Sequence, residues 1–164
     1  MLFRSGTIYQ TYHDEQDSNI LINDVQQFYV VTDDWNVYKC LYNNGGRPSQ
    51  EKPDSKNPVG TFTTPDNYVW KYMYTIKEAD RLRFSSTTYI PVTPSVEVQQ
   101  NAVDGALSLI EIINTQATAY PDDDIYVVIS GDGTGANAFA VRDEVQQTIE
   151  RIVIDNPGRG YTYR

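Results

Sequence analysis

The sequence predicts an all-β protein of antiparallel sheets arranged in β-sandwich-like domains, with one short helix near residues 77–84. Three observations predict this class. Aromatic and β-branched residues are concentrated in short runs, the runs are separated by Gly, Pro, Asn and Asp, and one run alternates large aromatic side chains with smaller or polar ones. Such alternation between turn-forming residues is typical of strands with one apolar face.

The core is expected around two strand-like runs, Trp35–Tyr42 and Tyr68–Ile76, which contain both tryptophans of the chain. Aromatic residues occupy alternate positions in the second run, which predicts that they line one face of a strand. We interpret this aromatic stripe as core. The alternative is that some of the rings line a sugar- or protein-binding face. The stripe consists of Tyr68, Trp70, Tyr72 and Tyr74.

The first hundred residues contain three further expected strands. Residues 7–12 and 27–32 are rich in Tyr, Phe, Val and Thr, which favours extended backbone. The second of these is joined to the Trp35 run by Asp33 and Asp34, a link short enough for a hairpin. Residues 61–64 are expected to pair briefly.

A short helix is predicted over residues 77–84. Its spacing of apolar residues predicts that Ala79, Leu82 and Phe84 face inward while the charged residues face solvent. Residues 96–102 are interpreted as a linker to the last third of the chain.

The segment Asn43–Gly60 is expected to be a long loop because it contains Pro48, Pro53 and Pro58 after a glycine pair. A loop of this length inside a compact domain tends to be functional or partner-bound. We therefore predict that it contacts other proteins. Deleting residues 47–56 should then weaken partner binding without unfolding the chain.

The last third is interpreted as a smaller β unit. The predicted organisation is one β domain over residues 1–100, built on the two Trp-containing strands, and a second unit over residues 101–164. Aligning Tyr120 with Tyr161 reveals a degenerate Gly-rich repeat, which the end of the chain truncates. Strands are expected at 107–113, 125–130, 136–141 and 147–154, with a glycine loop at 131–135 and a turn at 155–162.

Composition excludes several classes of protein. The formal net charge is −9, which argues against a nucleic-acid binder because the phosphate backbone attracts basic surfaces. With Cys40 as its only cysteine the chain forms no intramolecular disulfide. Its apolar runs are shorter than the roughly 20 residues of a membrane span, and the polar residues that follow Phe3 do not resemble a signal peptide.

The candidates for chemistry are weak. Gly131–Ala136 superficially resembles a dinucleotide-binding turn, but the residues that follow predict a strand where that motif needs a helix. The acidic run 122–124, together with Asp132, could bind calcium, although a solvated loop is the simpler interpretation because the EF-hand spacing is absent. The same holds for a metal cluster around His13, formed with Asp14, Glu15 and Asp17.

Catalysis is not predicted. Cys40 and His13, which a nucleophile pair would need, are far apart in sequence. A glycosidase needs only two carboxylates, so counting residues leaves that class open. We expect no catalytic, cofactor-binding or metal-ligating residues and no cofactor.

The middle of the chain carries a resemblance to a known family. Residues Asn36–Leu41, Asn43–Gly46 and Tyr68–Ile76 resemble the baseplate wedge protein of T-even-type contractile-tailed bacteriophages, the gene product eight type. The resemblance covers roughly the middle half of the chain, although this chain is much shorter than the family protein. Further matching residues are Pro48, Ser49, Lys52, Pro53, Ala79, Asp80, Phe84, Tyr89–Val92 and Gln100–Gly105.

The resemblance implies a non-enzymatic, mostly β component of the virion, located in the tail baseplate and assembled in the host cytoplasm. It implies a homodimer that contacts other baseplate wedge proteins, with no nucleic acid, membrane span or small-molecule substrate. The alternative is a carbohydrate-binding β-sandwich module of a phage tail or surface protein, based on the tyrosine content and acidic loops. A small hydrolase is a third hypothesis.

Overall fold

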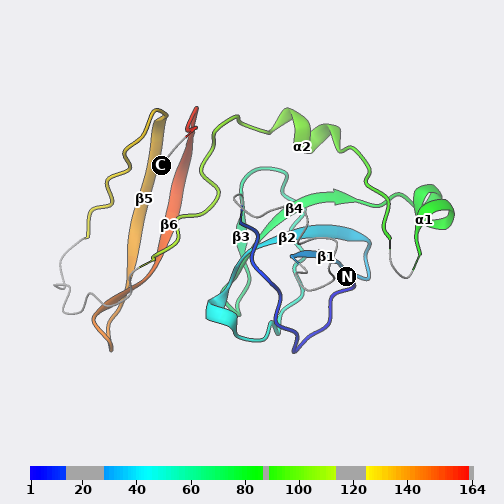
Figure 1. Cartoon of the computed structure of the whole chain (residues 1–164), viewed down its shortest axis with the longest axis horizontal. Coiled ribbons are helices and arrows are strands. Elements are labelled where there is room, and N and C mark those ends of the chain that lie inside the picture. The colour runs from blue at the N-terminus through cyan, green and yellow to red at the C-terminus, as the bar shows by residue number, and fades with distance from the viewer. Residues whose placement is uncertain (14–27, 87–88, 114–124, 163–164) are drawn as a thin grey trace. The chain divides into compact units, whose positions relative to one another are not determined.

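The computed structural model describes residues 1–13, 28–86, 89–113 and 125–162. The chain divides into two compact units, Met1–Ala102 and Val103–Arg164. Each contains one antiparallel sheet among the described residues, four-stranded in the first and two-stranded in the second (Figure 1). The predicted all-β, antiparallel class is therefore confirmed, while no second sheet layer is seen within either unit in the part of the chain that the structure describes.

The sheet of the first unit has the strand order β1-β2-β4-β3, with every neighbouring pair antiparallel. It confirms the expected strands around both tryptophans, the hairpin at Asp33–Asp34 and the brief pairing near residue 62. The hairpin turn closes with Trp35 N–H donating to Thr32 O at 2.9 Å. The strands are β1 (Tyr29–Val31), β2 (Asn36–Asn43), β3 (Phe62–Thr63) and β4 (Tyr68–Thr75).

The aromatic stripe of β4 is core, as predicted, for three of its four members. Tyr68, Trp70 and Tyr72 are buried, whereas Tyr74 and the residues between the buried rings are only partly buried. The Trp70 ring stacks on Tyr68 with centroids 5.5 Å apart and meets Tyr9 edge-on at 5.7 Å. Offset-stacked and edge-to-face rings add to the stability that burial itself provides. The cluster consists of Tyr9, Phe28, Val30, Tyr38, Cys40, Tyr68, Trp70 and Tyr72.

A second, smaller cluster consists of the buried residues Val31, Val37 and Ile76, with Trp35 and Tyr74 packed against it. Neighbouring residues of β2 belong to different clusters, because successive side chains of a strand point to opposite faces. Both faces of this strand are therefore buried.

The predicted strand over residues 7–12 is wrong. Only Thr7 pairs, through an isolated antiparallel bridge to Ser49. The segment instead inserts a side chain into the core: the Tyr9 ring is fully buried, and its hydroxyl accepts a hydrogen bond from Arg4 N–H at 2.7 Å. An aromatic-rich run packs its rings equally well in either conformation, so residue type did not distinguish them.

The predicted helix is confirmed as α1 (Glu78–Phe84), but its predicted inward face is wrong. Ala79 is exposed, and Leu82 and Phe84 are 74% and 62% exposed. The guanidinium of Arg81 lies 4.7 Å from the centre of the Trp35 ring, so a cation–π contact joins the helix to the rest of the unit.

A second helix, α2 (Val96–Gln100), occupies the segment expected to be a linker. The Ser95 hydroxyl caps it by accepting a hydrogen bond from Val98 N–H at 3.4 Å. None of the helices in the described ranges is long and apolar enough to cross a membrane.

The second unit is a long hairpin of β5 (Thr134–Asp143) and β6 (Thr148–Arg159). These confirm the two expected strands and extend both. The predicted turn at residues 155–162 is wrong for its first half, because β6 continues to Arg159. The pairing of β5 with β6 shifts register between Asn137, opposite Asn156, and Ala138, opposite Ile154, so Asp155 is left out of the pairing with β5.

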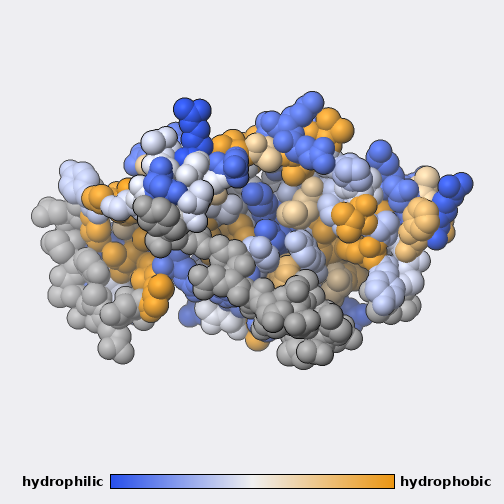
Figure 2. All heavy atoms as spheres, turned by 45° about the horizontal axis from the view of Figure 1, so that its top comes forward, coloured by the Kyte–Doolittle hydropathy of each residue, from blue (hydrophilic) through white to orange (hydrophobic). Residues whose placement is uncertain are grey.

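The expected strands at 107–113 and 125–130 are not formed as strands. Each has one backbone link to the hairpin: Leu107 N–H donates to Pro157 O at 2.9 Å, and Tyr126 bridges Phe139. The prediction of two strands here is therefore wrong. Hydrophobic residues lie at the surface of this unit, coloured orange in Figure 2.

Candidate functional site

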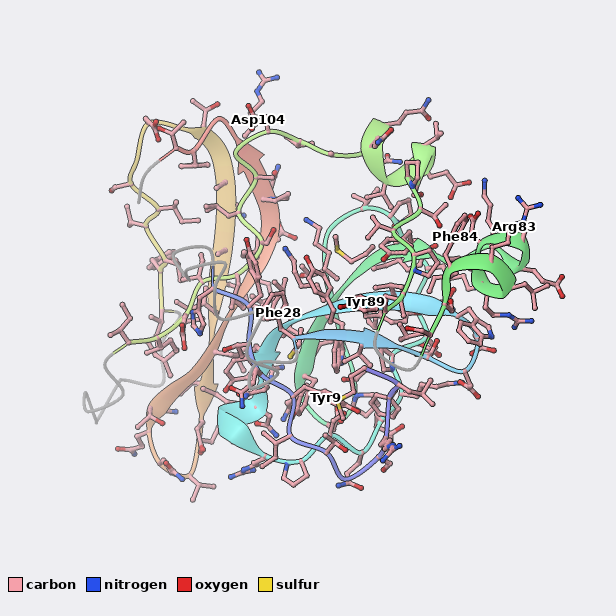
Figure 3. The ribbon with its side chains drawn as sticks, turned by 45° about the vertical axis from the view of Figure 1, so that its right-hand side comes forward. Tyr9, Phe28, Arg83, Phe84, Tyr89 and Asp104 are labelled. Atoms are coloured by element: carbon pink, nitrogen blue, oxygen red, sulfur yellow. The ribbon has the colours of Figure 1, made fainter. Side chains whose placement is uncertain are left out.

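The long loop after β2 begins with a tight turn over Asn44–Gly46. The Asn43 side chain fixes this turn by accepting a hydrogen bond from Gly46 N–H at 3.0 Å and donating one to Tyr9 O at 2.9 Å. Figure 3 shows Tyr9 on the N-terminal segment that runs beside the sheet. The turn is thus joined both to its own strand and to the start of the chain.

The next residues of the loop are anchored in the core. The hydroxyl of Tyr68 donates to Arg47 O at 2.6 Å. Ser49 N–H donates to Thr7 O at 2.9 Å, and Ser49 is fully buried. Pro53 is fully buried as well. The first half of the loop is therefore part of the folded core of the unit.

Asp66, in the turn between β3 and β4, collects hydrogen bonds from this part of the loop. Its Oδ2 accepts from the Ser49 hydroxyl at 2.8 Å, from Gln50 N–H at 2.8 Å and from Glu51 N–H at 3.0 Å. Its Oδ1 accepts from the Thr64 hydroxyl at 2.5 Å. One carboxylate thereby joins two segments that are distant in sequence.

The same contacts set the pKa of Asp66. Partial burial by itself raises the pKa of the carboxyl, but the hydrogen bonds from Thr64, Glu51, Ser49 and Gln50 together outweigh it and leave the pKa lowered. Hydrogen bonds to a carboxylate favour its charged form.

Lys52 joins the loop to the β1–β2 turn. Its Nζ lies 2.7 Å from Asp33 Oδ1 and 3.0 Å from Asp34 Oδ2. The hydrogen bond from Lys52 lowers the pKa of Asp33, and its two acidic partners raise the pKa of Lys52. All three side chains reach solvent, so screening limits what this ion pair contributes to stability.

The second half of the loop, from Asp54 to Gly60, has no buried residue, whereas the first half has exposed residues around the buried Ser49 and Pro53. Its own contacts are local: Val59 N–H donates to Asn57 Oδ1 at 3.0 Å, and Asn57 N–H donates to Ser55 Oγ at 3.3 Å. Val59 is an apolar side chain with more than half its surface in solvent. We call this segment the loop tip; another molecule can reach all of it without displacing a side chain from the core.

This division corrects the prediction that residues 47–56 can be deleted without unfolding. The deletion would remove Ser49 and Pro53 from the core and three hydrogen-bond donors from Asp66. It would also remove the partner of Asp33. Loss of such buried contacts is among the mechanisms that strongly destabilise proteins.

The candidate nucleophile and base are not brought together. Cys40 is fully buried in the aromatic cluster, and burial raises the pKa of its thiol to about 12. A thiol of this kind is inert because the thiolate is the nucleophile. His13 pairs instead with Thr11, whose Oγ1 lies 2.9 Å from His13 Nε2.

The candidate metal sites are largely outside the described residues. Asp14, Glu15 and Asp17 lie there, as does the acidic run 122–124. Among the residues that the structure describes, no group of three or more His, Cys, Asp or Glu side chains is placed to hold a metal ion. Asp132 uses its carboxylate within the chain, where Oδ1 accepts a hydrogen bond from Thr162 N–H at 3.0 Å and Oδ2 from its hydroxyl.

The glycine loop at 131–135 leads directly into β5, so the dinucleotide-binding motif, which requires a helix there, is excluded. Gly133 of this loop has a packing role, because a Cβ there would lie 2.3 Å from the Tyr161 ring. Gly158 in β6 allows a close backbone approach, because a Cβ there would lie 2.6 Å from the backbone nitrogen of Ala136.

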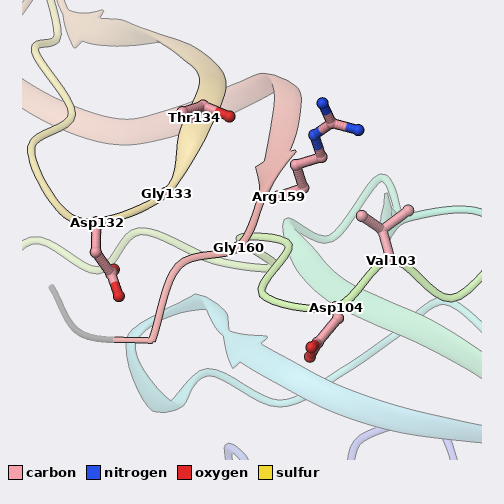
Figure 4. A pocket seen from close by; sticks show the side chains of 7 residues that line it. All are labelled: Val103, Asp104, Asp132, Gly133, Thr134, Arg159 and Gly160. Carbon is pink, nitrogen blue, oxygen red and sulfur yellow. The ribbon is translucent and has the colours of Figure 1, made fainter.

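A shallow depression of about 400 Å³ adjoins this loop (Figure 4). It carries the carboxylates of Asp104 and Asp132 and the side chain of Arg159. Asp132 is already bonded to Thr162, and the depression is open to solvent, unlike the enclosed pockets that hold small ligands. It is lined by Val103, Asp104, Asp132, Gly133, Thr134, Arg159 and Gly160.

The sugar-binding interpretation of the aromatic stripe is wrong, because Trp70 and Tyr68 are fully buried. A carbohydrate-binding module would have to use other rings. Exposed tyrosines among the described residues are Tyr29 and Tyr89 in the first unit and Tyr126 in the second.

Comparisons with protein-family models, curated proteins and solved structures found no match to this chain.

Proposed function

We propose that this chain is a structural component of a phage tail baseplate wedge that acts through protein–protein contacts and performs no catalysis. The observation that carries the proposal is where the motif residues lie. The segments that resemble the wedge family form β2, the anchored half of the loop and β4. Within them, Asn43 holds the turn, Lys52 joins the loop to a hairpin, and Trp70 fills the core.

A rigid base for an exposed segment supports a role in assembly. The anchored half of the loop holds the start of the loop tip, and β3, which pairs with β4, follows its end. A partner would therefore meet a segment whose attachment is already ordered. Pre-ordering reduces the entropy that binding must overcome. The loop tip is therefore our proposed contact element.

The open edges of the sheet are the second proposed contact element, because an edge strand offers unpaired backbone groups to another chain. The β1 edge is partly covered: Val31 N–H donates to Met1 O at 2.8 Å, and Phe3 N–H donates to Val31 O at 2.7 Å. The β3 edge is only two residues long. Short or covered edges limit indiscriminate pairing.

The proposed partners are other baseplate wedge proteins and a second copy of this chain in a homodimer. The proposed location is the virion, after assembly in the host cytoplasm. Both rest on the resemblance of the middle segment.

Peptide mass spectrometry on purified virions tests the proposal. We expect peptides of this chain in virions of the phage that encodes it, in constant proportion to other tail proteins. A chain that is abundant in infected cells but missing from virions would exclude the baseplate assignment.

The loop tip can be tested with the double substitution Lys56→Glu and Val59→Asp, which changes exposed side chains and leaves Ser49 and Pro53 in place. We expect incorporation into virions to fall while the thermal midpoint stays within about 2 °C of wild type. The control is Val92→Asp, a highly exposed valine elsewhere in the same unit. If the variant and the control are incorporated into virions equally well, the loop tip is not a contact with a partner.

A further inference from the structure

The second unit presents large apolar side chains to solvent. Tyr126 and Val128 are 88% and 84% exposed, and Phe139 is 51% exposed. Large apolar side chains scattered singly on a surface are ordinary, whereas a contiguous set marks an interaction site.

The three residues belong to one set because of strand geometry. Tyr126 is bridged to Phe139, and Phe139 pairs with Val153 in the hairpin. Residues directly opposite one another in a sheet share a face, and alternation along β5 adds Val141. Val128 follows Tyr126 by two residues and is exposed like it, whereas Val141 and Val153 are partly buried. We call these five residues the Tyr126 face: Tyr126, Val128, Phe139, Val141 and Val153.

The hairpin has little to stabilise it from within. Ala138 is the only apolar side chain that it buries among the described residues of the second unit. A two-stranded hairpin is marginally stable in water and needs a further layer packed on it. The Tyr126 face is the surface on which such a layer would bury most apolar area.

Charge indicates what kind of protein supplies that layer. Residues 103–164 contain ten Asp and Glu and four Arg, a formal net charge of 4 − 10 = −6. Two such units packed face to face would repel each other, which disfavours a second copy. Like charges across an interface cost affinity, and opposite charges raise association rate and specificity.

We propose that the Tyr126 face is a docking site for a different protein, one whose apolar surface is rimmed by Lys and Arg side chains. The apolar residues supply the buried centre of the interface, and the net negative charge of the unit attracts the basic rim. Arg151, which lies opposite Val141, is the one basic side chain that the hairpin register places on this face. The inference rests on the proposed assembly function and names the face and the chemistry of its partner.

The test uses the full chain and short random peptides displayed as a library. Peptides selected on the immobilised wild-type chain are sequenced, and their binding is measured by fluorescence anisotropy. We expect apolar residues at alternate positions with flanking Lys or Arg. We also expect affinity to fall severalfold as NaCl rises from about 50 to about 300 mM, because screening weakens charge pairing.

The decisive comparison is Tyr126→Ser against Tyr89→Ser. Both tyrosines are exposed, at 88% and 74%, and they lie in different units. Tyr126→Ser should weaken the selected peptides by about tenfold or more, as loss of a central aromatic contact does, whereas Tyr89→Ser should leave them unchanged. Circular dichroism on both variants checks that the fold is retained.

Three outcomes would overturn the inference. Peptides that bind both variants equally do not use the Tyr126 face. Peptides without basic residues, bound independently of salt, contradict the proposed rim. A concentration-dependent dimer in analytical ultracentrifugation that Tyr126→Ser abolishes would show that a second copy covers the face. Virion mass spectrometry on wild type tests assembly separately, so failure of the face is distinguishable from failure of the proposed function.

Discussion

At the scale of single residues, Asp66 holds the fold together by hydrogen bonds, whereas the residues considered for catalysis have only packing and local roles. It accepts hydrogen bonds from both the loop and its own turn, whereas Cys40 and His13 are taken up by packing and by a local contact. A charged acceptor with several donors holds backbone in place more firmly than a neutral one. The polar interior of this unit is therefore organised around a carboxylate.

Replacing Asp66 with Asn should lower the free energy of unfolding by about 2–3 kcal/mol, because charge-assisted hydrogen bonds are lost and partly buried donors remain unsatisfied. Urea denaturation followed by tryptophan fluorescence measures this. Asp54→Asn, at an exposed acidic residue nearby in the loop, is the control and should change stability by less than about 0.5 kcal/mol. Equal effects of the two changes would contradict the role assigned to Asp66.

The pH dependence of stability should carry the signature of the same residue. The pKa of Asp66 is lower in the folded chain than its usual value, so the stabilisation is fully present above about pH 4 and is lost as pH falls through the folded-state pKa. Thermal unfolding between neutral pH and about pH 2.5 should show a smaller acid loss in Asp66→Asn than in wild type. Identical pH profiles would contradict the prediction.

Cys40 should be unreactive in the native protein. It is fully buried, and burial raises its pKa to about 12, so almost no thiolate is present at pH 8. Ellman's reagent should detect no thiol in the folded chain and one per chain in urea. Rapid labelling without denaturant would show that the aromatic cluster opens.

At the scale of elements, α1 shows how a helix can be correctly predicted and its face misjudged. The spacing of apolar residues predicts an apolar stripe along the helix, and the helix forms with that stripe. Whether the stripe is buried depends on which other elements pack against the helix. Here the contact with the rest of the unit is made by Arg81 on the Trp35 ring. A basic residue on an aromatic face is invisible to an argument from apolar periodicity.

Two leucines provide a direct test of that difference. Leu82→Ala should cost less than about 0.5 kcal/mol because Leu82 is exposed, whereas Leu41→Ala should cost about 2–5 kcal/mol because Leu41 is buried in β2. Both values come from urea denaturation of the purified chain. A large loss at Leu82 would mean that α1 is packed in solution after all.

At the scale of the whole molecule, the two units differ in how complete they are. Both buried clusters of the first unit draw only on residues before position 102. The second unit buries a single apolar side chain among its described residues and leaves the Tyr126 face open. Buried apolar area is the main stabilising contribution to folding, so the units should not be equally stable alone.

A fragment of residues 1–102 should therefore fold cooperatively, and a fragment of residues 103–164 should not. Circular dichroism and urea titration of both fragments, compared with the full chain, provide the measurement. We expect a single sigmoidal transition for the first fragment and a broad one for the second. A cooperative transition for residues 103–164 alone would contradict the account of the second unit.

Much of the first unit was predictable from residue pattern, and much of the second was not. The strand β4 was evident because Tyr68, Trp70 and Tyr72 alternate, and period two is a local property. The segment 107–113 has an equally apolar pattern but forms no strand, and its backbone is linked to the hairpin by the hydrogen bond from Leu107. Apolar residues show that a segment seeks burial, whereas regular pairing depends on what lies beside it.

The candidate site divides in the same way. Sequence identified the long loop, because its prolines and glycines exclude regular structure. It did not separate the anchored half from the loop tip, because Ser49 is a small polar residue whose burial depends on Thr7 and Asp66, both remote in sequence. Asp66 had no local signal beyond its place in a turn.

What the sequence by itself determined is the class of the fold, the central strands and the long loop. Each follows from residue type and short-range spacing. Only the tertiary structure decided which half of the loop is core, which face of α1 is open and that Tyr126, Phe139 and Val153 form one surface. Those properties depend on distances between residues far apart in the chain, and neither composition nor periodicity contains them.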